Sequence, residues 1–144
     1  MSKRFKKSKR NAARFAKSIP TIELIIDRIG GKGDGVSEIN KIPKTPSEQK
    51  QSYFVPGTLP GEHIIARPVS KTNEGIFGQL LEIIKVSDHR VTAPCSYFGV
   101  CGGCSLQHWA PTAYQQWKVA RIKSAITKIS SPSTIIDNLR IYYC

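Results

Sequence analysis

The sequence predicts a mainly β protein: a small five-stranded barrel, then a cysteine-rich loop and one α-helix. Between residues 20 and 90, short runs rich in β-branched residues alternate with turns that contain Gly and Pro. Three cysteines then fall within ten residues, and apolar residues recur every three or four positions after Pro111. With 144 residues and no long apolar run, the chain has the length of about one domain, and we expect no membrane association.

The chain divides into three predicted segments: a basic disordered tail at 1–19, the barrel at 20–90, and the cysteine loop with its helix at 91–144. Residues 1–17 carry eight Lys or Arg and no acidic residue, whereas the remainder carries 14 basic and 10 acidic residues. Such a run of cations gains free energy by displacing counterions from a polyanion, which predicts nucleic acid as the partner. An organelle-targeting peptide and a solubilising tail are the alternatives.

The barrel segment opens with a predicted strand at 21–29, which stops at the glycine-rich turn 30–35. We interpret 30–35 as a turn, because it lacks the Lys-Ser/Thr of a phosphate-binding loop and no apolar helix pattern follows it. Residues 37–52 are polar and contain prolines, which predicts an exposed loop.

Further strands are predicted at 53–55, 63–68 and 76–86. Short strands at this spacing, with no helix between them, favour a closed barrel over a sandwich. With the strand that returns after the turn at 30–35, they make five strands in about 65 residues, which favours the oligonucleotide-binding (OB) type. Because side chains alternate along a strand, only one of Tyr53 and Phe54 can stack on an RNA base while the other packs in the core.

Cys95, Cys101 and Cys104 are the candidate metal ligands. Thiolates at these spacings can converge on one centre, and the glycines among them let the backbone curl around it. A disulfide with a spare thiol is disfavoured, because we see no apolar secretory segment and expect a cytoplasmic protein. The spacing favours iron–sulfur over zinc without deciding between them. Cys144, the last residue, is a poor fourth ligand, and a ligand outside this sequence is the alternative.

The last segment predicts a helix that starts near Pro111 and ends at Ser131-Pro-Ser. One side, which we expect to be buried, carries apolar residues at helical spacing: Val119, Ile122, Ile126 and Ile129. A neighbouring stripe carries the cations Lys118, Arg121 and Lys128, which could meet phosphates but more commonly form a solvated face. Residues 134–143 begin an apolar, strand-like stretch, and we expect this strand to be truncated.

Two sets of motifs carry a family resemblance. Gly33-Asp-Gly-Val36, Phe54-Val-Pro-Gly57 and Leu59-Pro-Gly-Glu62 resemble a TRAM domain. The stretch from Ser87-Asp-His-Arg-Val91 through Cys95-x5-Cys101-Gly-Gly-Cys104-Ser-Leu-Gln-His108 resembles the cluster-binding segment of class I RNA (uracil-5-)-methyltransferases, of the kind that modify uridine in 23S rRNA. The resemblance covers about residues 20–130 and is specific because the motifs occur in the family's order.

The resemblance implies a barrel that binds RNA, with rRNA as the first choice of partner and tRNA as the second. It implies a 4Fe–4S cluster for which Cys95, Cys101 and Cys104 match three of the four family ligands, while the fourth lies beyond the end of this sequence. The family's Rossmann-like catalytic domain, which binds S-adenosylmethionine, has no counterpart here. We therefore expect no catalytic and no S-adenosylmethionine-binding residue in this chain.

The chemistry of uracil methylation supports that expectation. A cysteine thiolate must attack carbon 6, and a base must later remove the proton from carbon 5. Three cysteines are committed to the metal site, and Cys144 has no neighbouring histidine or cation to activate it. We expect the RNA-docking, iron–sulfur portion of a methyltransferase, inactive alone. A stand-alone RNA-binding protein with a structural metal is the alternative.

Overall fold

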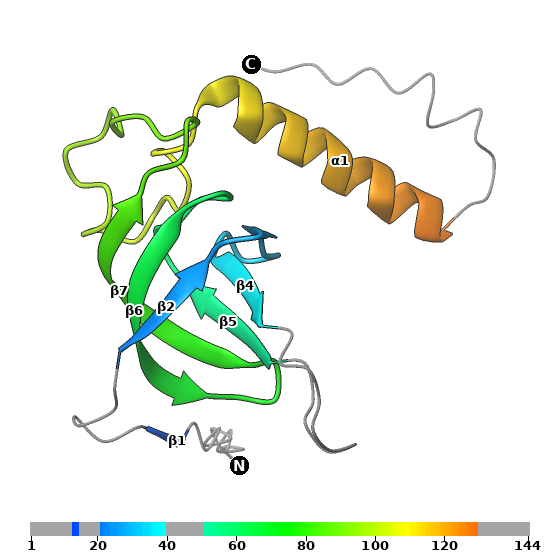
Figure 1. The fold of residues 1–144 in the computed structure, drawn as a ribbon. Coiled ribbons are helices and arrows are strands. Elements are labelled where there is room, and N and C mark those ends of the chain that lie inside the picture. The colour runs from blue at the N-terminus through cyan, green and yellow to red at the C-terminus, as the bar shows by residue number, and fades with distance from the viewer. Residues whose placement is uncertain (1–12, 15–20, 40–50, 130–144) are drawn as a thin grey trace, which may run out of the picture. The chain divides into compact units, whose positions relative to one another are not determined.

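The computed structural model describes residues 13–14, 21–39 and 51–129, and the chain forms two compact units, 1–88 and 89–144 (Figure 1). The first unit contains the strands β1 (Ala13–Arg14), β2 (Ile22–Ile25), β3 (Arg28–Ile29), β4 (Gly35–Ile39), β5 (Gln51–Val55), β6 (His63–Lys71) and β7 (Ile76–Lys85). The second contains α1 (Pro111–Ile129). The predicted class, mainly β with one helix, is confirmed, and the described residues include no Rossmann-like domain.

Strands β2 to β7 close on themselves. The neighbours β3–β4, β4–β5 and β6–β7 pair antiparallel, β5 and β7 pair parallel, and β2 returns to pair with β6. Because only two residues separate β2 from β3, these two act as one bent segment, so five segments form the ring β2/β3–β4–β5–β7–β6. This is the five-stranded barrel of OB type that the sequence predicts.

The single strand predicted at 21–29 is wrong in one respect, because it is interrupted at Ile26 and Asp27. The Ile26 N–H donates to the Glu62 carbonyl at 2.9 Å, and the Asp27 N–H donates to the Val36 carbonyl at 2.9 Å. The segment thus exchanges β6 for β4 as its partner at this point. The interruption is set by distant partners, which an unbroken run of β-branched residues does not reveal.

The exposed loop predicted at 37–52 is also too long. β4 continues to Ile39 and β5 begins at Gln51, and these two residues face each other across the strand pair. Ser37, opposite Tyr53, is only 4% exposed. Polar residues here belong to a ladder because backbone pairing does not require apolar side chains. Residues 40–50 lie outside the described part of the chain.

Two other predictions fall largely outside the described residues. In the predicted tail, 1–19, the structure describes only β1, which pairs antiparallel with Ser70 and Lys71 of β6. The strand-like stretch 134–143 and Cys144 are not among the described residues. The tail's role therefore stays a prediction.

The barrel core is built from alternate residues of its strands. Its buried members are Leu24, Ile26, Tyr53, Val55, Ile64, Ala66 and Ile76. One carboxylate is fully buried beside this core: Glu62 accepts a hydrogen bond from the Leu59 N–H at 2.8 Å and another from the Ser87 N–H at 3.5 Å. Glu62 thus joins the turn before β6 to the segment after β7.

The predicted helix is confirmed as α1, but its apolar side is not buried as expected. Ile122 is 41% exposed, and Val119 and Ile126 are only half-buried. Helical spacing selects one side of a helix, whereas burial also requires a surface to cover that side. No helix among the described residues combines the length and apolar character needed to cross a membrane.

Candidate functional sites

A cavity of about 180 Å³ opens on the barrel between two turns. It is lined by Gly30, Gly31, Lys32, Asp34, Phe54, Glu74 and Phe77. The rings of Phe54 and Phe77 stack with centroids 5.2 Å apart and planes 24° apart, because the two residues are register partners in the parallel β5–β7 pair. The two stacked rings thus form an aromatic wall of the cavity, and the charged side chains of Lys32, Asp34 and Glu74 form its rim.

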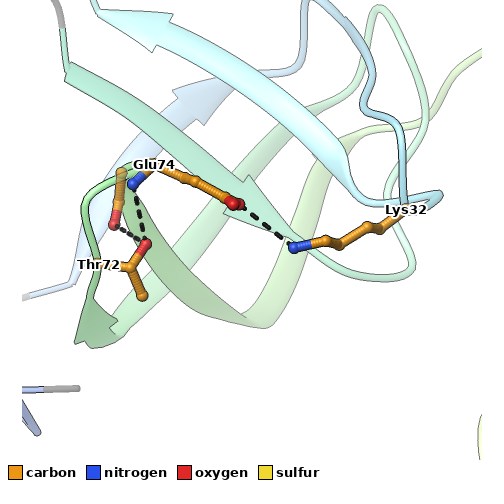
Figure 2. Close-up of polar contacts among 4 residues, drawn as sticks. Lys32, Thr72 and Glu74 are labelled. Carbon is orange, nitrogen blue, oxygen red and sulfur yellow. Dashed lines mark hydrogen bonds and ion pairs between the residues drawn. The ribbon is translucent and has the colours of Figure 1, made fainter. Parts of the chain in front are cut away.

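An ion pair links the two turns at this rim. Figure 2 shows Lys32, from the turn between β3 and β4, reaching toward Glu74, from the turn between β6 and β7. The Lys32 Nζ lies 3.3 Å from the Glu74 Oε2, and the Thr72 Oγ1 accepts a hydrogen bond from the Glu74 N–H at 3.2 Å. The two charged side chains are 71% and 65% exposed, so this pair contributes little to stability and can exchange partners.

Asp34 supplies the second charge of the turn after β3. Its carbonyl accepts a hydrogen bond from the Gly30 N–H at 2.8 Å, and Gly33 takes a positive φ of 89° to close the turn. Burial raises the pKa of the Asp34 carboxyl above its ordinary value of 3.8, and the nearby Lys32 ammonium opposes this with a smaller effect. Within the described residues, no hydrogen bond reaches the Asp34 carboxylate.

The predicted alternation of Tyr53 and Phe54 holds. Tyr53 is 7% exposed and packs in the core, while Phe54 lines the cavity. The remaining cavity residues were missed by the sequence analysis, which interpreted 30–35 as a turn and nothing more. Their only sequence signal is the Lys-Gly-Asp triplet inside that turn, and the contribution of Phe77 depends on non-local pairing.

The cysteine loop belongs to the second unit and is closed at its base. Arg90 and Trp109 form an antiparallel bridge. The Val91 N–H donates to the His108 carbonyl at 2.9 Å, and the Ala110 N–H donates to the His89 carbonyl at 2.8 Å. Residues 92–107 therefore form a loop whose two ends are held together by this bridge and these hydrogen bonds. The Phe98 ring, 5.2 Å from the His108 ring, ties the loop to this base.

The three predicted ligands lie in that loop as free thiols. Cys95 is half-buried, and Cys101 and Cys104 are exposed. The glycines predicted to curl the backbone do so at two positions, because Gly99 and Gly102 have φ of 81° and 73°. The Gly103 N–H lies 3.5 Å from the Cys101 Sγ and donates to it.

The donor set suits an iron–sulfur cluster chemically, because accessible thiolates and backbone N–H groups that donate to sulfur are what such clusters use. The structure does not gather the donors: among the described residues, no three His, Cys, Asp or Glu side chains are placed together to hold a metal ion. The ligand assignment of Cys95, Cys101 and Cys104 therefore stays a prediction.

An aromatic cluster at the start of α1 was not predicted. Trp109, Tyr114 and Trp117 lie with ring centroids 5.8 to 6.2 Å apart. The Lys118 ammonium lies 4.5 Å from the Tyr114 ring centroid, and the Arg121 guanidinium lies 5.4 Å from that of Trp117. Two cations of the predicted stripe thus make cation–π contacts. The signal in the sequence is the four-residue spacing of each cation from its aromatic partner.

Comparison with known proteins finds similarity to RNA methyltransferases. An RNA methyltransferase of Caulobacter vibrioides is 38% identical over 101 residues, which are 70% of this chain and 21% of that protein. The 23S rRNA (uracil(1939)-C(5))-methyltransferase RlmD of Acidithiobacillus ferrooxidans is 33% identical over 107 residues, 74% of this chain and 22% of that protein.

An RNA methyltransferase of Listeria monocytogenes is 32% identical over 117 residues, 81% of this chain and 24% of its own length. No protein-family profile matches the chain. The chain therefore spans about a fifth to a quarter of the length of the curated relatives it matches.

Proposed function

Because this chain is homologous to a part of the RNA methyltransferases, we propose that it is the RNA-docking portion of a uracil-5 methyltransferase that acts on rRNA in the cytoplasm. The observation that carries the proposal is the homology to a 23S rRNA uracil methyltransferase over a segment that folds as a closed OB-type barrel. Barrels of this type bind single-stranded nucleic acid on a groove lined by aromatic and basic side chains. The barrel's cavity, with its aromatic wall and Lys32, provides such groups.

The proposal includes a 4Fe–4S cluster held by Cys95, Cys101 and Cys104, with a fourth ligand from outside the described residues. The loop at 92–107 supports it by offering accessible thiols, two glycines with positive φ and an N–H that donates to a sulfur. When bound, the cluster would cross-link the loop, because metal binding and ordering of the binding segment are coupled. The methyl donor would bind to a part of the enzyme outside the described residues.

Purified 1–144 is expected to transfer no methyl group from S-adenosylmethionine to unmodified rRNA, since no methyl-donor site or activated nucleophile is identified in it. Fusion to the remaining part of an RlmD relative is expected to give turnover. The measurement is incorporation of labelled methyl groups into a 23S rRNA fragment, with the intact relative as the positive control. Methylation by 1–144 alone would contradict this division of labour. An inactive fusion whose catalytic half is folded would favour the stand-alone RNA-binding alternative.

Deletion of residues 1–17 is expected to weaken RNA binding and to flatten its dependence on salt. The tail carries eight cations, and each phosphate contact on a single strand contributes about 0.7 to the slope of log affinity against log salt. The slope should fall by several units in fluorescence-anisotropy titrations. A variant with the eight cations changed to Gln controls for chain length. Identical affinities and salt slopes for the unaltered chain and the chain without residues 1–17 would show that the tail does not bind RNA.

A further inference from the structure

We propose that the cavity beside Phe54 and Phe77 binds one unpaired nucleobase of the RNA and prefers guanine. This inference rests on the proposed RNA-binding function and names the chemistry that one part of the barrel would recognise. Three properties of the cavity support it: its aromatic wall, the pairing of an acceptor with a donor on one turn, and the weakness of the ion pair at its rim.

The aromatic wall suits a planar ring. Phe54 and Phe77 are half-buried and stacked on each other, and together they present ring surface to a cavity of about 180 Å³. Every base has a π-face, so an aromatic wall favours stacking with any of them. Gly30 preserves this space, because a Cβ at that position would lie 3.9 Å from the Phe54 ring and 3.0 Å from Val36. Binding of an unpaired base is thus favoured, but the wall does not select which base.

The charged groups on the turn after β3 supply the selection. The Asp34 carboxylate accepts hydrogen bonds but, within the described residues, receives none, and Lys32 two positions earlier is a donor. Guanine places two adjacent donors, N1–H and the N2 amino group, beside the O6 acceptor. The guanine edge can therefore donate hydrogen bonds to both oxygens of the Asp34 carboxylate and accept one from the Lys32 ammonium. Uracil offers one donor between two carbonyls, and adenine offers an amino group and no carbonyl, so both satisfy this pair less completely.

The ion pair between Lys32 and Glu74 does not block this arrangement. Its atoms are 3.3 Å apart and both side chains are mostly exposed, so water screens the attraction and the pair opens at little cost. Lys32 can then turn toward a carbonyl or a phosphate of the ligand. Glu74 stays on the neighbouring turn, where its negative charge disfavours a base that turns a carbonyl oxygen toward it.

The test compares the binding of short unstructured RNAs that differ at one central base. The chain 1–144 is titrated by fluorescence anisotropy with a uridine oligonucleotide carrying guanine, adenine or uracil at its centre. We expect guanine to bind about tenfold more tightly than uracil, because a good bidentate contact discriminates by about 5- to 150-fold. Asp34→Asn is expected to remove this preference, so that the oligonucleotides with central guanine and central uracil bind with similar affinity.

Two further variants complete the design. Phe77→Leu is expected to weaken binding of all three oligonucleotides, because it removes a stacking surface common to every base. Glu82→Gln, which removes an exposed carboxylate on β7 outside the cavity, is the matched control and should keep the guanine preference. Asp34→Asn should fold normally: because the folded-state pKa of Asp34 is raised, its charge opposes folding at neutral pH, so its removal should not lower the melting temperature.

The outcomes separate this inference from the proposed function. RNA binding with no base preference, or with a preference that Asp34→Asn leaves intact, would overturn the guanine pocket while RNA docking stands. Absence of binding to any oligonucleotide or to the rRNA fragment would overturn both. A guanine preference that is lost in Asp34→Asn and kept in Glu82→Gln supports the pocket.

Discussion

Replacement of Glu62 by alanine is expected to lower the free energy of unfolding by about 3 kcal/mol, because its buried carboxylate accepts two backbone hydrogen bonds and a hydrogen bond to a charged group contributes about 1.5–3 kcal/mol. Glu62 is fully buried, and its carboxylate accepts from the N–H groups of Leu59 and Ser87 at 2.8 and 3.5 Å. Because small domains have a total stability of about 5–15 kcal/mol, the loss would unfold a substantial part of the population under mild stress.

Urea denaturation of the full chain, followed by far-ultraviolet circular dichroism, measures this effect. The matched control is Glu82→Ala, which removes an exposed carboxylate from β7 and should shift the midpoint little. Glu62→Gln keeps one acceptor oxygen and should fall between the two. Equal midpoints for Glu62→Ala and Glu82→Ala would mean that Glu62 does not hold the turn before β6 to the segment after β7.

Replacement of Cys101 by serine is expected to abolish cluster assembly. Anaerobic reconstitution of the unaltered chain should give a brown protein that contains iron and acid-labile sulfide, and the variant should remain colourless, because a serine hydroxyl is a poor substitute for a soft thiolate ligand. Cys144→Ser is the matched control and should keep its colour, since Cys144 is not one of the predicted ligands. A colourless unaltered protein with stoichiometric zinc would refute the iron–sulfur assignment.

Elements whose signals are local could be predicted from the sequence. The turn at 30–35 is marked by its glycines, and α1 is marked by Pro111 and its apolar spacing. Features imposed by distant partners could not be predicted. The interruption at Ile26 and Asp27 depends on acceptors in Glu62 and Val36, and polar composition at 37–52 concealed the paired ends of β4 and β5.

The candidate sites follow the same division. Three cysteines near one another in sequence identify a loop, but convergence of their thiolates depends on the folded path and on a ligand outside the described residues. The cavity on the barrel has no compact motif, because Asp34, Phe54 and Phe77 come from three separate segments. Only the parallel pairing of β5 with β7 places the two phenylalanines together.

That parallel pairing also constrains the order of folding. β5 can pair with β4 at once, but it can gain its second partner, β7, only after β6 has been synthesised and β7 has turned back beside it, and β2 must wait for β6. Contacts between segments distant in sequence carry a larger loop-closure entropy and slow the folding rate, whereas α1 forms from contacts along one segment. On the ribosome, therefore, the barrel cannot complete its hydrogen-bonded ring before Lys85 has left the exit tunnel.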